Sequence, residues 1–408
     1  MTKAKLALRL PQNQLTVHSL CVFLIATYML LLPFEYVLTS EFGSINRYIG
    51  ILIIGTCVIS GKFRLSIGES TLLLLCFLLY GVISGFWAIS LGYWSDVFFI
   101  YLKNAALFLA VTQCRFTRDQ NNFIMRCYIL GSILLVFYLI TSSNVYVDAL
   151  SGRTVISVAG GFFDPNYMAA DIIMPMGYAY GLFYKNLAKN QYKQMIGPIA
   201  VIVLLFYIII VSGSRGALLA TFAMFFFITV FNLRNKAIRR RVLMIALVLF
   251  LLFLIVLQML PEQIAERFSL DSLLGKTDSG GGRIELWVAA LQGIRDNFFF
   301  GYGAGCAIPA VGMYHGTDRA AHSLYFSSVL EFGVFALLLY AAIGMEIRRA
   351  YHRRQYEEVG MAIGILIACA FLDSLTTKFF WSFLMILFMR NRMQLEEDEP
   401  MVLRLHAE

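Results

Sequence analysis

The chain has 408 residues, of which 59% are hydrophobic and only 14% are charged, with a formal net charge of +8. This composition excludes an ordinary soluble protein, because apolar runs of the length that crosses a bilayer, about 20 residues, recur along the whole chain. The positive charge gathers in short segments between the apolar runs, so it gives no indication of nucleic-acid binding.

The apolar runs predict about twelve membrane-spanning helices, because a helix satisfies its own backbone hydrogen bonds in lipid. In chain order we expect them at 17–38, 45–60, 71–89, 97–113, 122–140, 165–184, 195–212, 215–232, 241–260, 322–345, 357–373 and 378–391. The fold class is therefore all-α, a polytopic integral membrane protein that forms a single membrane domain over residues 1–408.

The distribution of Lys and Arg predicts the orientation of the spans. Of the 33 basic residues, 23 lie in the N-terminal tail, in alternate connections and in the C-terminal tail. This is the positive-inside pattern, so we expect both termini in the cytoplasm. Two outer segments, 141–164 and 261–321, are longer than simple connections require. We expect the second to be a large, partly helical loop inserted before the tenth span.

The other ten basic residues fall on the outer side of the membrane or near it. They are Arg47, Lys103, Arg153, Arg215, Arg267, Lys276, Arg283, Arg295, Arg319 and Lys378. Because outer cations do not help to orient the spans, they predict an anionic ligand on that side.

Two of these arginines stand at expected helix starts. Arg215 follows Ser214, a typical N-cap residue, and Arg283 follows three glycines. A helix N-terminus attracts anions, and a guanidinium binds phosphate with two parallel hydrogen bonds. An arginine in this place can also simply extend toward water, an alternative of similar weight. The two arginines together predict a phosphate or pyrophosphate site.

His322 opens the expected tenth span at the outer interface, where an imidazole titrates near neutrality. It is a candidate general base, although an interfacial anchor is an equally good interpretation of a lone histidine. Glu331 lies nine residues further on, on the opposite helix face, so we expect it to bond a neighbouring span. The supporting candidates on the outer side are Arg153, Arg319, Lys378 and His315.

The remaining polar residues near the spans have structural interpretations. We expect Asp164 to cap a helix that starts at Pro165, and Lys103 to pair with Asp171. Asp373 and Lys378 are expected to cap a tight outer turn. No Cys-His spacing, carboxylate cluster or nucleotide-binding motif is present, so we expect neither a metal nor a cofactor.

The motifs between residues 163 and 333 resemble, in their order and spacing, the O-antigen ligase and polymerase superfamily of bacterial inner membranes. The matching segments are FDPNYMA (163–169), SGSRGA (212–217), GRIELW (282–287), FGYGAG (300–305), HSLY (322–325) and EFG (331–333). The twelve expected spans and the long outer loop fit the ligase branch best.

The resemblance implies a metal-independent enzyme that takes its sugar chain from an undecaprenyl-pyrophosphate carrier on the periplasmic face. The ligase branch passes O-antigen to the lipid A-core of lipopolysaccharide. By this likeness Arg215 and Arg283 hold the pyrophosphate and His322 acts as the base. Ser323 stands where the family usually has asparagine.

Three other functions stay open. A polysaccharide polymerase shares the donor and the chemistry, and a protein O-oligosaccharyltransferase is usually a longer chain. An anion transporter belongs to a different class and is expected to show polar or broken helices at mid-membrane. Here the polar residues gather at one side of the membrane, which favours an enzyme.

Overall fold

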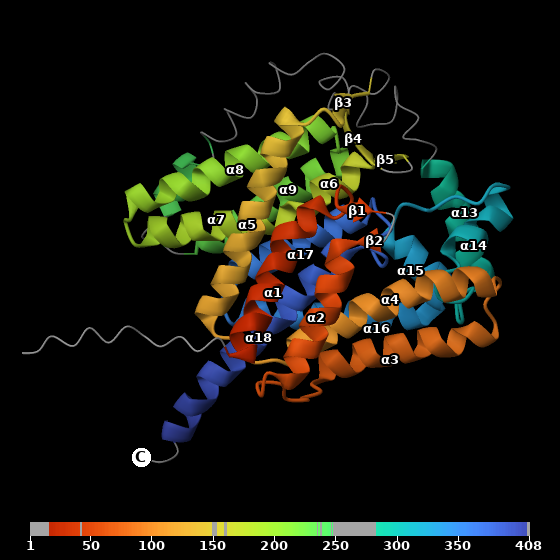
Figure 1. The fold of residues 1–408 in the computed structure, drawn as a ribbon, viewed down its shortest axis with the longest axis horizontal. Coiled ribbons are helices and arrows are strands. Elements are labelled where there is room, and N and C mark those ends of the chain that lie inside the picture. The colour runs from red at the N-terminus through yellow and green to blue at the C-terminus, as the bar shows by residue number, and fades with distance from the viewer. Residues whose placement is uncertain are drawn as a thin grey trace, which may run out of the picture.

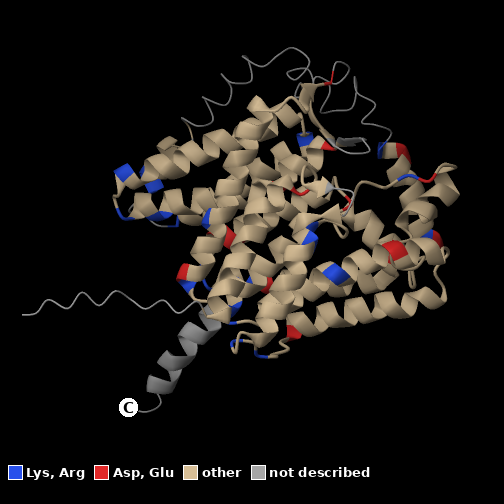
Figure 2. Ribbon diagram, in the orientation of Figure 1, with Lys and Arg blue, Asp and Glu red and all other residues tan. Residues whose placement is uncertain are grey.

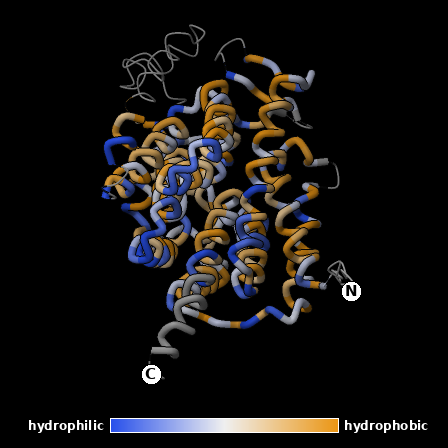
Figure 3. Tube along the Cα trace, turned by 90° about the vertical axis from the view of Figure 1, so that its left-hand side faces the viewer, coloured by the Kyte–Doolittle hydropathy of each residue, from blue (hydrophilic) through white to orange (hydrophobic). Residues whose placement is uncertain are grey.

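A computed structural model describes residues 16–40, 43–148, 153–158, 161–234, 236, 239–245, 247 and 283–405. Within these ranges the protein is mostly helical, with two small antiparallel sheets at one end of the helix bundle (Figure 1). Hydrophobic residues run along nearly the whole length of most helices (Figure 3), as expected for helices that face lipid as well as each other.

The N-terminal part packs five helices around one short hairpin. The elements are α1 (Val17–Leu31), a 3-10 turn (Leu32–Phe34), β1 (Thr39–Ser40), β2 (Gly43–Ser44), α2 (Ile45–Ile59), α3 (Glu69–Ile83), a 3-10 turn (Ser84–Phe86), α4 (Leu91–Thr112) and α5 (Arg118–Thr141). Side-chain caps fix several starts; Thr117 and Gln120 form a reciprocal capping box at α5.

The expected outer segment 141–164 contains a three-stranded antiparallel sheet, β3-β4-β5, which the helical patterns did not predict. Its strands are β3 (Val145–Val147), β4 (Thr154–Val158) and β5 (Gly161–Phe163). The helices that follow are α6 (Pro165–Asp171), α7 (Ile173–Ala188), α8 (Tyr192–Ser212) and α9 (Arg215–Asn232).

The C-terminal part begins with two helices that lie beside the bundle at the right of Figure 1. The elements are α13 (Arg283–Asp296), α14 (Ala307–His315), α15 (Leu324–Phe332), a 3-10 turn (Gly333–Phe335), α16 (Ala336–His352), α17 (Tyr356–Cys369) and α18 (Lys378–Leu405). The expectation of a partly helical loop before the tenth span agrees with α13 and α14 in the part of that loop that is described.

Within the described part of the chain, seven helical segments are long and apolar enough to cross a membrane, and the shorter apolar helix Ile45–Ile59 joins them. The seven are Val17–Phe34, Glu69–Phe86, Leu91–Thr112, Arg118–Thr141, Tyr192–Ser212, Arg215–Asn232 and Leu324–His352. The chain is therefore an α-helical membrane protein. The count of twelve stays a prediction, and the expected span 241–260 lies almost entirely outside the described residues.

Two of the expected spans, 165–184 and 322–345, are interrupted in the structure. Asp171 ends α6 and Ile173 starts α7. The second break is at Gly333, whose φ of +57° combined with a ψ of −139° is open essentially only to glycine. The backbone of the outer loop docks at this break, because Tyr302 N donates to Leu330 O over 2.7 Å and Gly303 N donates to Glu331 O over 3.1 Å. The loop thus binds carbonyls that the interruption frees.

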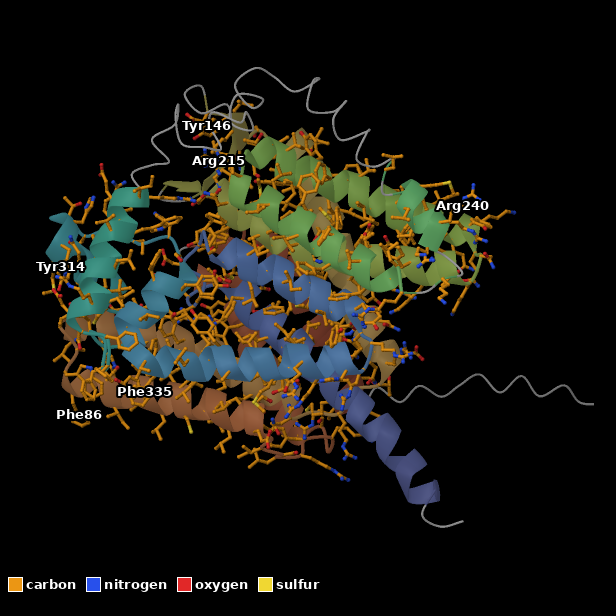
Figure 4. All side chains as sticks on the ribbon, turned by 180° about the vertical axis from the view of Figure 1, so that it is seen from behind. Phe86, Tyr146, Arg215, Arg240, Tyr314 and Phe335 are labelled. Atoms are coloured by element: carbon orange, nitrogen blue, oxygen red, sulfur yellow. The ribbon has the colours of Figure 1, made fainter. Side chains whose placement is uncertain are left out.

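The two ends of the bundle differ in the side chains and the elements that they carry. Lys and Arg gather at the turn that joins α7 to α8 and at the connection after α2 (Figure 2). Arg215 lies at the opposite end from Arg240, close to Tyr146 of β3 (Figure 4). We call the end that carries the sheets, Arg215 and α13 the outer end, in keeping with the orientation predicted from the sequence.

Candidate active site

The segment between α17 and α18 holds the start of α15 through the side chain of Asp373. One carboxylate oxygen, Oδ2, accepts the backbone N–H of His322 over 2.8 Å, and the other accepts the hydroxyl of Ser327. Asp373 was expected to cap a tight outer turn, but both of its carboxylate oxygens bond the start of α15 instead. Its side chain fixes the start of α15, which is 51 residues away in sequence.

His322 does not open a helix, because its φ is +51° and α15 starts two residues later at Leu324. The imidazole Nδ1 lies 3.8 Å from Asp373 Oδ2, and 38% of the side chain is exposed. A carboxylate on this side favours the tautomer that carries its proton on Nδ1. Nε2 is then the nitrogen that can accept a proton from a ligand.

Arg215 is placed by a tight reversal between α8 and α9. Gly213 adopts a left-handed conformation, and Ser214 Oγ accepts Ala217 N over 3.3 Å, which confirms the predicted N-cap. A Cβ added to Gly216 would lie 2.8 Å from the ring of Phe371. The start of α9 therefore packs directly against the segment that carries Asp373.

Arg283 is the first residue of α13, as predicted. One turn later, Trp287 Nε1 donates to Ala321 O over 3.0 Å, and its ring lies 5.7 Å from Phe326 and 6.4 Å from Phe371. Trp287 is thus half-buried and turned toward the protein. The hydrogen bond to Ala321 ties α13 to the residue that precedes His322.

Arg283 interacts electrostatically with the other charged residues of this site. Burial lowers the pKa of its guanidinium from its ordinary value; the Asp164 carboxylate raises that pKa and Arg215 lowers it further. Asp373 also raises it. Because an arginine pKa starts above about 12, the group stays charged. Arg283 is therefore within electrostatic range of one other guanidinium and of two carboxylates.

Arg153 links two helices that support this site. Its Nε donates to Ser212 O over 2.6 Å, and its guanidinium donates to Asn166 Oδ1 over 2.9 Å. Asp164 lies 3.9 Å from it and accepts Asn166 N over 2.8 Å, the N-cap predicted for α6. Arg153 thus ties the start of α6 to the end of α8, directly before Arg215.

The other supporting candidates lie elsewhere. Lys378 donates to Glu35 and, over 2.7 Å, to Ser44 Oγ at the β1–β2 hairpin. His315 bonds Thr317 over 2.8 Å at the end of α14, and Arg319 is exposed. Arg267 and Lys276 lie outside the described residues.

Two further predictions on buried polar residues have opposite outcomes. Glu331 accepts the Tyr101 hydroxyl of α4 over 2.9 Å, so its predicted bond to a neighbouring span is confirmed. Lys103 and Asp171 form no ion pair. Lys103 lies within electrostatic range of Arg47 instead, and the prediction of a Lys103–Asp171 pair was wrong.

The assembled site is a cationic group at the outer end of the bundle. It brings together three guanidiniums, from Arg153, Arg215 and Arg283, against the carboxylates of Asp164 and Asp373. In the described ranges no group of three or more His, Cys, Asp or Glu side chains could hold a metal ion. The excess positive charge next to an imidazole is suited to binding a phosphorylated ligand and accepting a proton.

Residues 200–341 match the family model described as O-Antigen ligase. This match supports the assignment of the chain to the O-antigen ligase family. The matched region contains Arg215, Arg283 and His322, and Asp373 lies beyond it. No curated protein and no solved structure matches the chain.

The family match supports a place in the ligase and polymerase superfamily, a family that implies polysaccharide and lipid-linked substrates. Together with the apolar helices it indicates a bacterial membrane protein. Asp373 is the site residue that sequence reasoning assigned wrongly. The available signal was an acidic residue between two expected spans on the side that carries His322.

Proposed function

We propose that the protein is an O-antigen ligase, an inverting and metal-independent glycosyltransferase. It moves O-antigen polysaccharide from undecaprenyl pyrophosphate to lipid A-core on the periplasmic face of the bacterial inner membrane. The observation that supports this most strongly is the convergence of three chain segments, which carry Arg215, Arg283 and His322, on the short stretch from Phe371 to Asp373.

The arginines neutralise the charge of the leaving group. The bond that breaks joins the anomeric carbon of the donor sugar to an oxygen of the carrier pyrophosphate, and its electron pair stays on that oxygen. Pyrophosphate leaves readily once its charge is neutralised, so fixed guanidiniums supply what the step needs. Arg215 and Arg283 bind the two phosphates, and Arg153 holds the turn from which Arg215 projects.

His322 activates the nucleophile as a general base. A sugar hydroxyl of the acceptor loses its proton to Nε2 as its oxygen forms the new bond to the anomeric carbon, and positioned base catalysis of this kind contributes about 10²–10⁴-fold. The Asp373 carboxylate then stabilises the imidazolium. Attack from the side opposite the pyrophosphate inverts the anomeric configuration.

The competing functions differ in acceptor or in class. A polysaccharide polymerase uses a second carrier-linked chain as the acceptor, and a protein O-oligosaccharyltransferase uses a polypeptide hydroxyl. An anion transporter needs a polar path through the bundle. The break at Gly333 argues against such a path there, because the loop backbone around Tyr302 and Gly303 occupies it.

Purified protein in liposomes tests the proposal. Given undecaprenyl-pyrophosphate-linked O-antigen and lipid A-core, it is expected to attach polysaccharide to the core at the same rate with and without EDTA. Elongation of the carrier-linked chain instead would identify a polymerase. Dependence on a divalent ion would contradict the metal-independent mechanism.

A further inference from the structure

We propose that the outer end holds a second anion site, formed by Arg47, Lys103 and Lys378, which binds a phosphate group on the sugar headgroup of the acceptor glycolipid. This inference rests on the proposed ligase function, since that reaction has two lipid-anchored substrates. The site lies where the β1–β2 hairpin, the start of α2, the middle of α4 and the start of α18 meet.

The packing of α2 against α4 determines which residues face each other. A Cβ added to Gly50 would lie 3.7 Å from Leu107 Cδ2, and seven residues further along each segment Cys114 Sγ, just past the end of α4, lies 3.4 Å from Cys57 O. The two helices therefore run parallel in a constant register. One turn toward the outer end, the same register places Asn46 level with Lys103.

The charges of this cluster do not balance. Lys378 bonds Glu35 and Ser44, so Glu35 offsets one of the three cations. In the part of the chain that is described, no ion pair engages Arg47 or Lys103. These two cations nevertheless lie within electrostatic range of each other and of Lys378. Arg47 and Lys103 are both exposed, so their charges are available to an anion that approaches from outside the chain.

Asn46 provides an independent sign of a ligand. Its side chain is only 2% exposed, and neither its amide nitrogen nor its amide oxygen has a hydrogen-bond partner. Buried polar groups in proteins are almost always paired, so an unpaired amide directly before Arg47 and level with Lys103 indicates a missing partner. A phosphate oxygen would accept from the amide nitrogen, and a sugar hydroxyl would donate to the amide oxygen.

Three aromatic side chains lie between this site and the transfer site. The ring of Tyr36, next to Glu35, stacks on Phe163 at 3.8 Å and lies 6.5 Å from Tyr167. The Tyr167 hydroxyl donates to Asp373 O over 3.4 Å. The segment that carries Asp373 continues into Lys378, so one stretch of chain contributes to both sites. This arrangement gives each lipid substrate its own anionic anchor beside the reacting groups.

Lys103→Met tests the assignment in the liposome assay, with lipid A-core in its phosphorylated and dephosphorylated forms. We expect the KM for the phosphorylated acceptor to rise about 10- to 100-fold, the effect of losing one charge-assisted hydrogen bond. The kcat and the KM for the donor should not change, and Lys103→Arg should restore most of the affinity. The dephosphorylated acceptor should show the same high KM with both proteins. Arg295→Met removes an exposed outer cation, 79% exposed, and serves as the matched control.

Direct binding of the two glycolipids to purified protein separates this inference from the function. Phosphate-dependent binding that Lys103→Met and Asn46→Leu both weaken would support the site even if no transfer occurred. A rise in the KM for the donor alone would assign the cations to the carrier pyrophosphate and overturn the proposal. Equal binding of both glycolipids to wild-type protein would also overturn it.

Discussion

His322→Asn is expected to lower the rate of polysaccharide transfer by about 10²–10⁴-fold, the usual contribution of a positioned base. Asparagine suits this test because it tolerates the left-handed backbone at this position, where φ is +51°. The variant should therefore keep the backbone bond to Asp373 and the start of α15. Initial rates with purified protein, together with binding of the carrier-linked donor, give the measurement.

His315→Asn is the matched control, because His315 ends α14 and, among the described residues, bonds only its neighbour Thr317. Its transfer rate should stay near that of the wild type. The transfer rate of Asp373→Asn should fall between those of the two histidine variants, since this substitution removes the charge that stabilises the imidazolium. Near-normal transfer by a folded His322→Asn protein would leave His322 as an interfacial anchor.

Arg215→Ala and Arg283→Ala are each expected to lower kcat by about 10²–10³-fold, as loss of one fixed donor to a developing negative charge does. A lysine keeps the charge but loses the paired hydrogen bonds of the guanidinium, so Arg215→Lys and Arg283→Lys should retain part of the activity. The double alanine variant should be little worse than either single one, because both groups act on one pyrophosphate.

Arg295→Ala provides the control for a general loss of outer positive charge. Arg295 pairs with Asp296 on the exposed side of α13. The Arg295→Ala variant should therefore transfer polysaccharide at the wild-type rate. Single alanine variants with unchanged kcat would show that another group neutralises the leaving pyrophosphate. Strictly multiplicative losses in the double variant would show that the two arginines act on different steps.

Local sequence signals predicted the parts of the site that local structure controls. Ser214 and Asp164 cap their helices as their positions indicate, and Arg283 starts α13 directly after a glycine run. The predicted bond from Glu331 to a neighbouring helix also followed from helical spacing, because Tyr101 faces it from α4. In each case a short pattern determines the conformation or direction of the residue.

Contacts between distant segments were not predictable in the same way. Asp373 bonds a residue 51 positions away, and Trp287 turns toward Ala321, because neighbouring elements offer these groups better partners than their own helices do. The break at Gly333 likewise depends on a loop that docks from outside the span. Periodicity within one helix contains no information on such partners.

The central claim is that this protein transfers finished O-antigen to lipid A-core, and the lipopolysaccharide of a deletion strain tests it most directly. Loss of the gene is expected to leave lipid A-core without O-antigen while long O-antigen chains accumulate on the undecaprenyl carrier. Wild-type protein, but not His322→Asn, should restore the long chains to the core. Core that carries a single repeat unit in the deletion strain would contradict the claim and identify the protein as the polymerase.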